Sequence, residues 1–141
     1  MRNKPIVTAL LVLAVLALAA AAGRAAELPP QLTTSPETLA DQFLRGLSGQ
    51  VTLSPEELAA VRPILVEQTR KRQEIARARL AANPGLAGML ALREDMRAVT
   101  KETDVKLAAI LPPDKMEKIR AYRERRREEI KAVAKNMRNG D

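Results

Sequence analysis

The sequence predicts an all-α fold of four helices, one short and three long, that form a thin, kinked helical hairpin layer. Apolar residues recur at three- and four-residue spacing over long segments, helix start signals precede these segments, and no stretch alternates apolar and polar residues as a strand would. The 141 residues include one Phe and one Tyr. An interior built mainly from Ala and aliphatic side chains favours thin helical layers, or a dimer in which the apolar side chains of two chains pack at a common interface.

Residues 1–25 are predicted to be a secretory signal peptide. Arg2 and Lys4 precede an almost purely apolar run from Ile6 to Ala22, and small residues follow. We place cleavage after Ala25, with the alanines at 22 and 26 as near alternatives. An uncleaved N-terminal membrane anchor is the other interpretation of this run. A cleaved leader predicts export to the periplasm.

The composition excludes several classes of function. The chain has 24 basic and 17 acidic residues and a formal charge of +7, which falls to +4 when the three basic residues of the leader are removed. Cys and His are absent, which removes lipid attachment through an N-terminal Cys, disulfides, zinc sites and imidazole catalysis. No phosphate loop, serine elbow or cofactor fingerprint occurs. We expect no enzyme activity, cofactor or metal, and export disfavours nucleic acid as a partner.

The first elements of the mature chain are predicted to be an arm and a short helix. Residues 26–34 contain paired prolines and no periodicity, so we expect a flexible arm. Ser35 then caps a helix that begins at Pro36 and ends near Arg45, where Gly46 and Gly49 follow. Its apolar face, Leu39, Phe43 and Leu47, is expected to cover one end of the main hairpin.

The segment from Ser54 to Ala82 carries the clearest helix start in the chain. Ser54 and Glu57 form an S-x-x-E capping box around Pro55. Pro63 lies inside this helix, where it deletes a backbone hydrogen bond at a cost of about 3 kcal/mol unless the helix bends. We expect a kink there, and the alternative is that one helix ends and a second begins.

Two further long helices are predicted after the stop signal Asn83-Pro84-Gly85. The third, from about Leu86 to Ile110, has the most regular apolar stripe, and the fourth runs from Pro113 to about Met137. The predicted helical domain therefore covers residues 35–137, and residues 138–141 form a frayed tail.

Four arginines fall on the predicted apolar stripes of the second and fourth helices. An unpaired charge buried there would cost several kcal/mol, so these stripe segments are predicted to share one open, concave face of apolar and basic groups. Other arginines, such as Arg70 and Arg125, are interpreted as the solvated side of their helices. The predicted residues that bind a client protein are Arg72, Arg79, Arg123 and Arg126 for charge, with Leu65, Ile75, Met96, Met116, Ile119 and Tyr122 as apolar contacts.

The two helix starts carry a resemblance to a known family. The segments LSPEE at Leu53 and LPPDK at Leu111 resemble degenerate copies of the doubled L-T-x-x-Q signature of the Spy/CpxP family of bacterial periplasmic proteins, and the similarity spans about residues 47–131. Ser54 and Pro112 replace the Thr, and Glu57 and Lys115 replace the Gln. The motif positions are Leu53, Ser54, Pro55, Glu57, Leu111, Pro113 and Lys115.

The resemblance implies a cradle-shaped antiparallel homodimer that works as an ATP-independent chaperone or as an envelope-stress adaptor. Relatives that sense or resist metals rely on ligand clusters that this sequence lacks. We expect a periplasmic protein that holds unfolded or partly folded envelope proteins without nucleotide or metal. The alternative is a regulatory adaptor that docks on the periplasmic domain of a sensor kinase. Attachment to an anionic membrane surface through the fourth helix is a third interpretation, which the lack of Trp or Phe in that helix disfavours.

Overall fold

The computed structural model describes residues 30–82 and 85–140, and all the regular structure in these ranges is helical. The helices are α2 (Pro30–Thr33), α3 (Pro36–Leu47), α4 (Pro55–Ala82), α5 (Leu86–Ala108) and α6 (Pro113–Asn139). The predicted all-α class is confirmed: the short helix and the three long helices that were predicted are α3, α4, α5 and α6, and the four-residue α2 is additional. The predicted signal peptide, residues 26–29, the turn at 83–84 and Asp141 lie outside the described residues.

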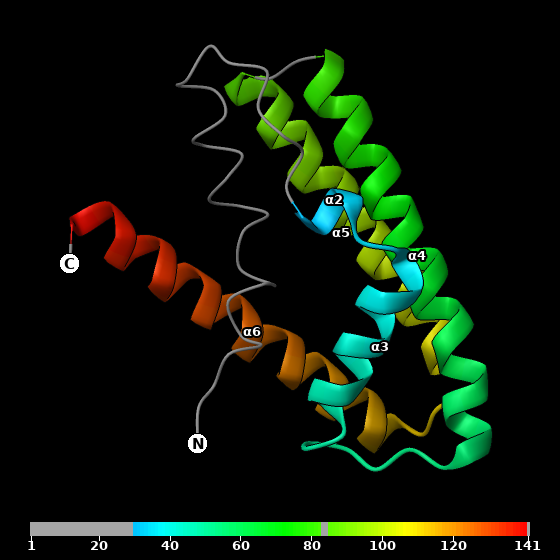
Figure 1. The fold of residues 1–141 in the computed structure, drawn as a ribbon. Helices are drawn as coiled ribbons and strands as arrows, with labels where there is room; N and C mark the ends of the chain where they lie inside the picture. Colours follow the sequence, from blue (N-terminus) through cyan, green and yellow to red (C-terminus); the bar gives the residue numbers. More distant parts are fainter. Residues whose placement is uncertain (1–29, 83–84, 141) are drawn as a thin grey trace.

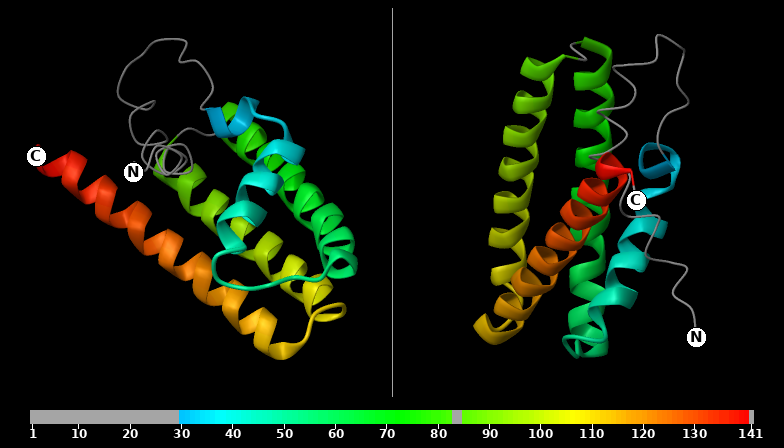
Figure 2. Two further views of the ribbon diagram at one scale, coloured as in Figure 1. Left: turned by 60° about the horizontal axis from the view of Figure 1, so that its bottom comes forward. Right: turned by 90° about the vertical axis from the view of Figure 1, so that its left-hand side faces the viewer.

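The frame of the molecule is an antiparallel hairpin of α4 and α5 (Figure 1). Helices α2 and α3 lie along α4, and α6 begins at the same end of the hairpin as α4 and then diverges from it (Figure 2). We call this end, where residues 48–54 and 109–112 connect the helices, the proximal half of the hairpin. The distal half is the part that leads to Ala82 and Leu86.

The start of α4 has the predicted capping geometry. The Glu57 amide donates to Ser54 Oγ at 3.1 Å, and the Ser54 amide donates to Glu57 Oε1 at 2.9 Å. The Lys115 ammonium of α6 also donates to that carboxylate. The capping box therefore joins the beginnings of α4 and α6, and with them the two copies of the predicted family motif. Helix α4 continues through Pro63, so the alternative of two separate helices is wrong.

The main hydrophobic core lies in the proximal half. Leu107 and Ile119 have 0% and 1% of their surface exposed, and Leu47 and Val61 are equally covered. The buried members of this cluster come from α3, α4, α5, α6 and the two connecting loops: Ala40, Leu47, Val51, Val61, Leu65, Val66, Leu107, Leu111, Met116 and Ile119. A second, smaller cluster in the distal half consists of Leu32, Ala76 and Leu92.

Three predicted boundaries are corrected by the structure. Residues 30–34 are not a flexible arm, because α2 forms there and buries Leu32 against the hairpin. Helix α3 does not end before Gly46 but continues through it to Leu47, and the missing side chain of Gly46 leaves room for Tyr122. The tail predicted to fray from residue 138 is helical through Asn139, and Gly140 follows with the left-handed φ of 77° that is common after a helix.

None of the helices within residues 30–82 and 85–140 is long and apolar enough to span a membrane.

Candidate client-binding surface

The four predicted arginines do not lie together on one open face. Arg79 lies in the distal half, where it forms an exposed ion pair with Asp95 at 2.8 Å. The ion pair with Asp95 raises the pKa of Arg79 and connects α4 to α5. Its charge is used within the hairpin, which weakens its assignment to client binding.

Arg126 packs against the two aromatic rings of the chain. Its guanidinium carbon lies 5.7 Å from the centroid of the Phe43 ring and 5.6 Å from that of Tyr122. The two rings meet edge to face at 5.3 Å, in a geometry that favours aromatic pairs. A Cβ at Gly46 would lie 2.0 Å from the Tyr122 hydroxyl. Arg126 and Tyr122 therefore attach α6 to α3.

Arg123 and Arg127 of α6 lie close enough to Arg72 of α4 for their charges to lower its pKa. Arg123 is ion-paired with Asp104 of α5, and its side chain is 17% exposed. Its Nη2 is buried and finds no hydrogen-bond partner among the described residues. Arg127 is exposed and paired with Glu124 at 2.9 Å. We name these three residues, Arg72, Arg123 and Arg127, the α4–α6 arginine cluster.

Arg72 is the member of this cluster whose charge is not balanced. Its guanidinium donates to Thr100 Oγ1. It also donates to the Gln68 side-chain oxygen at 3.1 and 3.2 Å when that amide is oriented to satisfy both of its polar atoms. No ion pair joins Arg72 to a carboxylate of the described residues. Burial lowers the pKa of Arg72 to about 10, with a further contribution from the charges of Arg123 and Arg127.

The predicted apolar contacts divide between core and surface. Leu65, Met116 and Ile119 are at most 4% exposed and belong to the main core, so their assignment to an open binding face is corrected. Ile75 and Met96 are half-buried around the distal cluster, and Tyr122 is half-buried against the main core. Apolar side chains that are exposed lie elsewhere, mainly along α5, and were not predicted: Leu86 at 73%, Leu90 at 55% and Val105 at 67%.

Sequence reasoning placed the stripe of α4 in the wrong register beyond Leu65. A three-four spacing that starts at Val61 and Leu65 predicts Gln68 and Arg72 as the next stripe positions, but the buried positions are Gln73 and Ala76. The two registers differ by one residue. A buried Gln inside an apolar stripe hides the true register, because it breaks the pattern at the position that would reveal it. Arg72 and Arg79 therefore lie beside the buried stripe and not on it.

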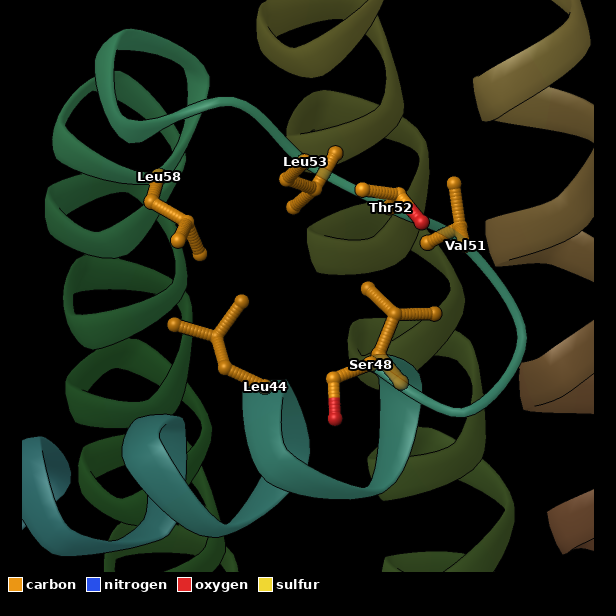
Figure 3. Close-up of a pocket in the computed structure, with 7 residues that line it drawn as sticks. Leu44, Ser48, Val51, Thr52, Leu53 and Leu58 are labelled. Atoms are coloured by element: carbon orange, nitrogen blue, oxygen red, sulfur yellow. The ribbon is translucent and has the colours of Figure 1, made fainter.

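A small apolar hollow lies at the corner between α3 and α4 (Figure 3). Its volume is about 150 Å³, and its lining consists of Leu44, Leu47, Ser48, Val51, Thr52, Leu53 and Leu58. This is smaller than sites for drug-sized ligands, which usually exceed roughly 300 Å³. None of the predicted arginines lines it, and we interpret it as a packing gap beside the main core.

A search for metal ligands and three comparisons with known proteins complete the description of the site. Among residues 30–82 and 85–140, no three acidic side chains converge as a possible metal site. No protein-family model matches the chain, and comparisons with curated proteins and with solved structures also find no match. The Spy/CpxP resemblance, with the homodimer, the periplasmic location and the partners it implies, therefore stays a prediction.

Proposed function

We propose that the protein is an exported, ATP-independent chaperone that holds unfolded or partly folded proteins on apolar and basic surface of its helices. The observation that carries the proposal is the state of Arg72. This half-buried guanidinium has only neutral hydrogen-bond partners among the described residues, and the charges of Arg123 and Arg127 also act on it. A fold that needed only stability would gain free energy if this partly desolvated charge were replaced by an apolar side chain. An acidic segment of a partner would supply the carboxylate that Arg72 lacks.

Exposed apolar surface supports the same proposal. Leu86, Leu90 and Val105 stand on α5, and Met137 on the diverging end of α6 is 59% exposed. Short apolar contacts combined with charge attraction suit weak, fast binding of varied chains, and such binding lowers the free concentration of aggregation-prone species. Because binding and release are both reversible, this holding mechanism requires no nucleotide.

The first test is suppression of aggregation, measured by light scattering. α-Lactalbumin, which is acidic, and lysozyme, which is basic, are each unfolded with dithiothreitol, a reductant that cannot alter a chain without cysteine. We expect suppression without ATP near stoichiometric ratios, stronger for α-lactalbumin, and weaker as salt rises. No suppression of either client at any ratio would remove the chaperone function.

A matched pair of variants tests the role of the cluster. Arg72→Gln and Arg97→Gln remove one positive charge each, but Arg97 is exposed on α5 and forms an ion pair with Glu94. We expect Arg72→Gln to weaken suppression of α-lactalbumin aggregation and to reduce its salt dependence, while Arg97→Gln has little effect. Equal activity of the two variants would remove the assignment of Arg72. Saturable binding to one folded sensor domain, without suppression, would instead support the adaptor.

A further inference from the structure

Residues 30–34 occupy a small binding site on the distal half of the hairpin. We call this site, formed by Gln73, Arg77 and the apolar side chains around Leu32, the seat. Helix α2 places Leu32, which is 5% exposed, between Ala76 of α4 and Leu92 of α5. Ile75, Leu80 and Met96 border this small cluster. Two of them, Ile75 and Met96, are predicted client contacts. Helix α2 lies against the α4–α5 hairpin (Figure 1), and its Leu32 therefore covers part of the surface that was predicted to bind clients.

Helix α4 holds this segment through its main chain. The side-chain amide nitrogen of the buried Gln73 donates to the carbonyl oxygens of Gln31 and Thr34, both at 2.7 Å. The Arg77 guanidinium donates to the carbonyl oxygen of Leu32. These contacts recognise three peptide carbonyls and one aliphatic side chain. Every protein segment has such carbonyls, and many have a suitable side chain, so this form of recognition is nearly independent of sequence.

The segment itself is short. Helix α2 has four residues, and a helix of that length is not stable by itself. Two of its residues, Gln31 and Leu32, are buried, and the apolar cluster beneath Leu32 has two other buried members. Because this cluster is much smaller than the main core, we expect the segment to open at a lower free energy than the proximal half.

We propose that this seat, formed by Gln73, Arg77 and the apolar side chains around Leu32, binds an aliphatic side chain and the adjoining peptide carbonyls of an unfolded client, and that residues 30–34 occupy it as an internal competitor. This inference rests on the proposed chaperone function. It specifies what the hairpin recognises in a client, namely an aliphatic side chain and the adjoining peptide carbonyls. A client must displace residues 30–34, so its apparent affinity is reduced by the fraction of molecules in which the seat is open.

The inference is tested by the affinity of the full chain for fluorescein-labelled, reduced and carboxymethylated α-lactalbumin, measured by fluorescence anisotropy. Leu32→Ala weakens the competitor and should raise the affinity about five- to tenfold. The control is Thr33→Ala, in the same segment, because Thr33 is exposed and its hydroxyl donates within its own turn to the Pro30 carbonyl oxygen; it should leave the affinity unchanged. Adding Gln73→Met to Leu32→Ala keeps a similar volume but removes both donors, and should cancel the gain.

A second readout follows the competitor directly. Because the native chain lacks cysteine, Thr33→Cys gives a single labelling position for a spin label. Saturating client should mobilise the label, and circular dichroism confirms that each variant is folded. Client binding with an immobile label and no gain from Leu32→Ala would overturn the internal competitor and leave the chaperone function standing. Absence of client binding by the native chain and by Leu32→Ala would remove the chaperone function, and this inference with it.

Discussion

The two halves of the α4–α5 hairpin differ in how they are held together. In the proximal half, ten buried side chains from four helices and two loops form one cluster, and the capping box of α4 is tied to α6. In the distal half, the apolar cluster has three buried members among residues 30–82 and 85–140, namely Leu32, Ala76 and Leu92, and side-chain hydrogen bonds from Gln73 to residues 31 and 34 add to the packing. The difference indicates that the proximal half provides stability and the distal half provides surface that can be given up to a partner.

The largest expected effect is a difference between two Leu-to-Ala substitutions. Leu107 is fully buried in the main core, whereas Leu92 is 7% exposed in the small cluster. Leu107→Ala should lower the free energy of unfolding by about 3–5 kcal/mol, and Leu92→Ala by about 2 kcal/mol or less, because the site around Leu92 can collapse or admit water. Urea denaturation followed by circular dichroism measures both values. Equal losses would show that the two halves are equally packed.

The next effect tests the contact that attaches α6 to the proximal half. A Cβ at Gly46 meets the Tyr122 hydroxyl, whereas a Cβ at Gly49 would lie 3.8 Å from its nearest neighbour, an ordinary contact. Gly46→Ala should destabilise by about 1–2 kcal/mol despite the better helix propensity of Ala, and Gly49→Ala should be nearly neutral. Tyr122→Phe removes the clashing oxygen and should recover part of the loss. Failure of this rescue would mean that Gly46 matters for another reason.

A smaller effect concerns the pH dependence of the α4–α6 connection. The hydrogen bond from Lys115, together with that from the Ser54 amide, holds the pKa of Glu57 below its usual range. Because the folded pKa is lowered, this contribution to stability is present above the unfolded value near 4.5 and is lost as pH falls through the folded value. In the native chain the urea midpoint of unfolding should decrease as the pH is lowered from about 5 to about 3, and Glu57→Gln should make this decrease smaller. Glu56→Gln, one residue away, is the control, and identical profiles for the two variants would contradict this role.

The smallest effect is expected for the exposed ion pair of the distal half. Arg79 and Asp95 are 44% and 31% exposed, and solvent screens such pairs. Arg79→Ala should leave the urea midpoint nearly unchanged, with a still smaller effect at high salt. A loss of stability as large as that of Leu92→Ala would mean that this pair, and not the small apolar cluster, holds the distal half together.

The long helices could be predicted because their signals are local. The capping box at Ser54, the prolines at 55 and 113 and the stripe of α5 act through neighbouring residues, and the structure has those helices within a few residues of the predicted ends. Residues 30–34 could not be predicted in this way. Their order depends on Gln73 and Arg77, about forty residues away, and the local sequence carries no helical periodicity.

The candidate site was predicted in part for a related reason. A stripe position identifies which residues lie near the buried side of a helix, but not which helix covers them. Arg123 and Arg126 of α6 were predicted on an open face, whereas the structure has both partly buried with partners inside the chain, Asp104 for the first and Phe43 with Tyr122 for the second. Ile75 is half-buried and Ile119 is fully buried because different helices pack over them. The periodicity of the sequence does not predict this difference in burial.

The most direct test of the division between the halves is hydrogen–deuterium exchange of the full chain, with and without an excess of reduced, carboxymethylated α-lactalbumin. We predict slow exchange in residues 55–66 and 103–119 in both samples. Client should change the exchange of residues 30–34, of the distal parts of α4 and α5, and of α6 around Arg123 and Arg127. Client-induced changes confined to residues 55–66 and 103–119, or faster exchange there than in the distal half without client, would contradict the account.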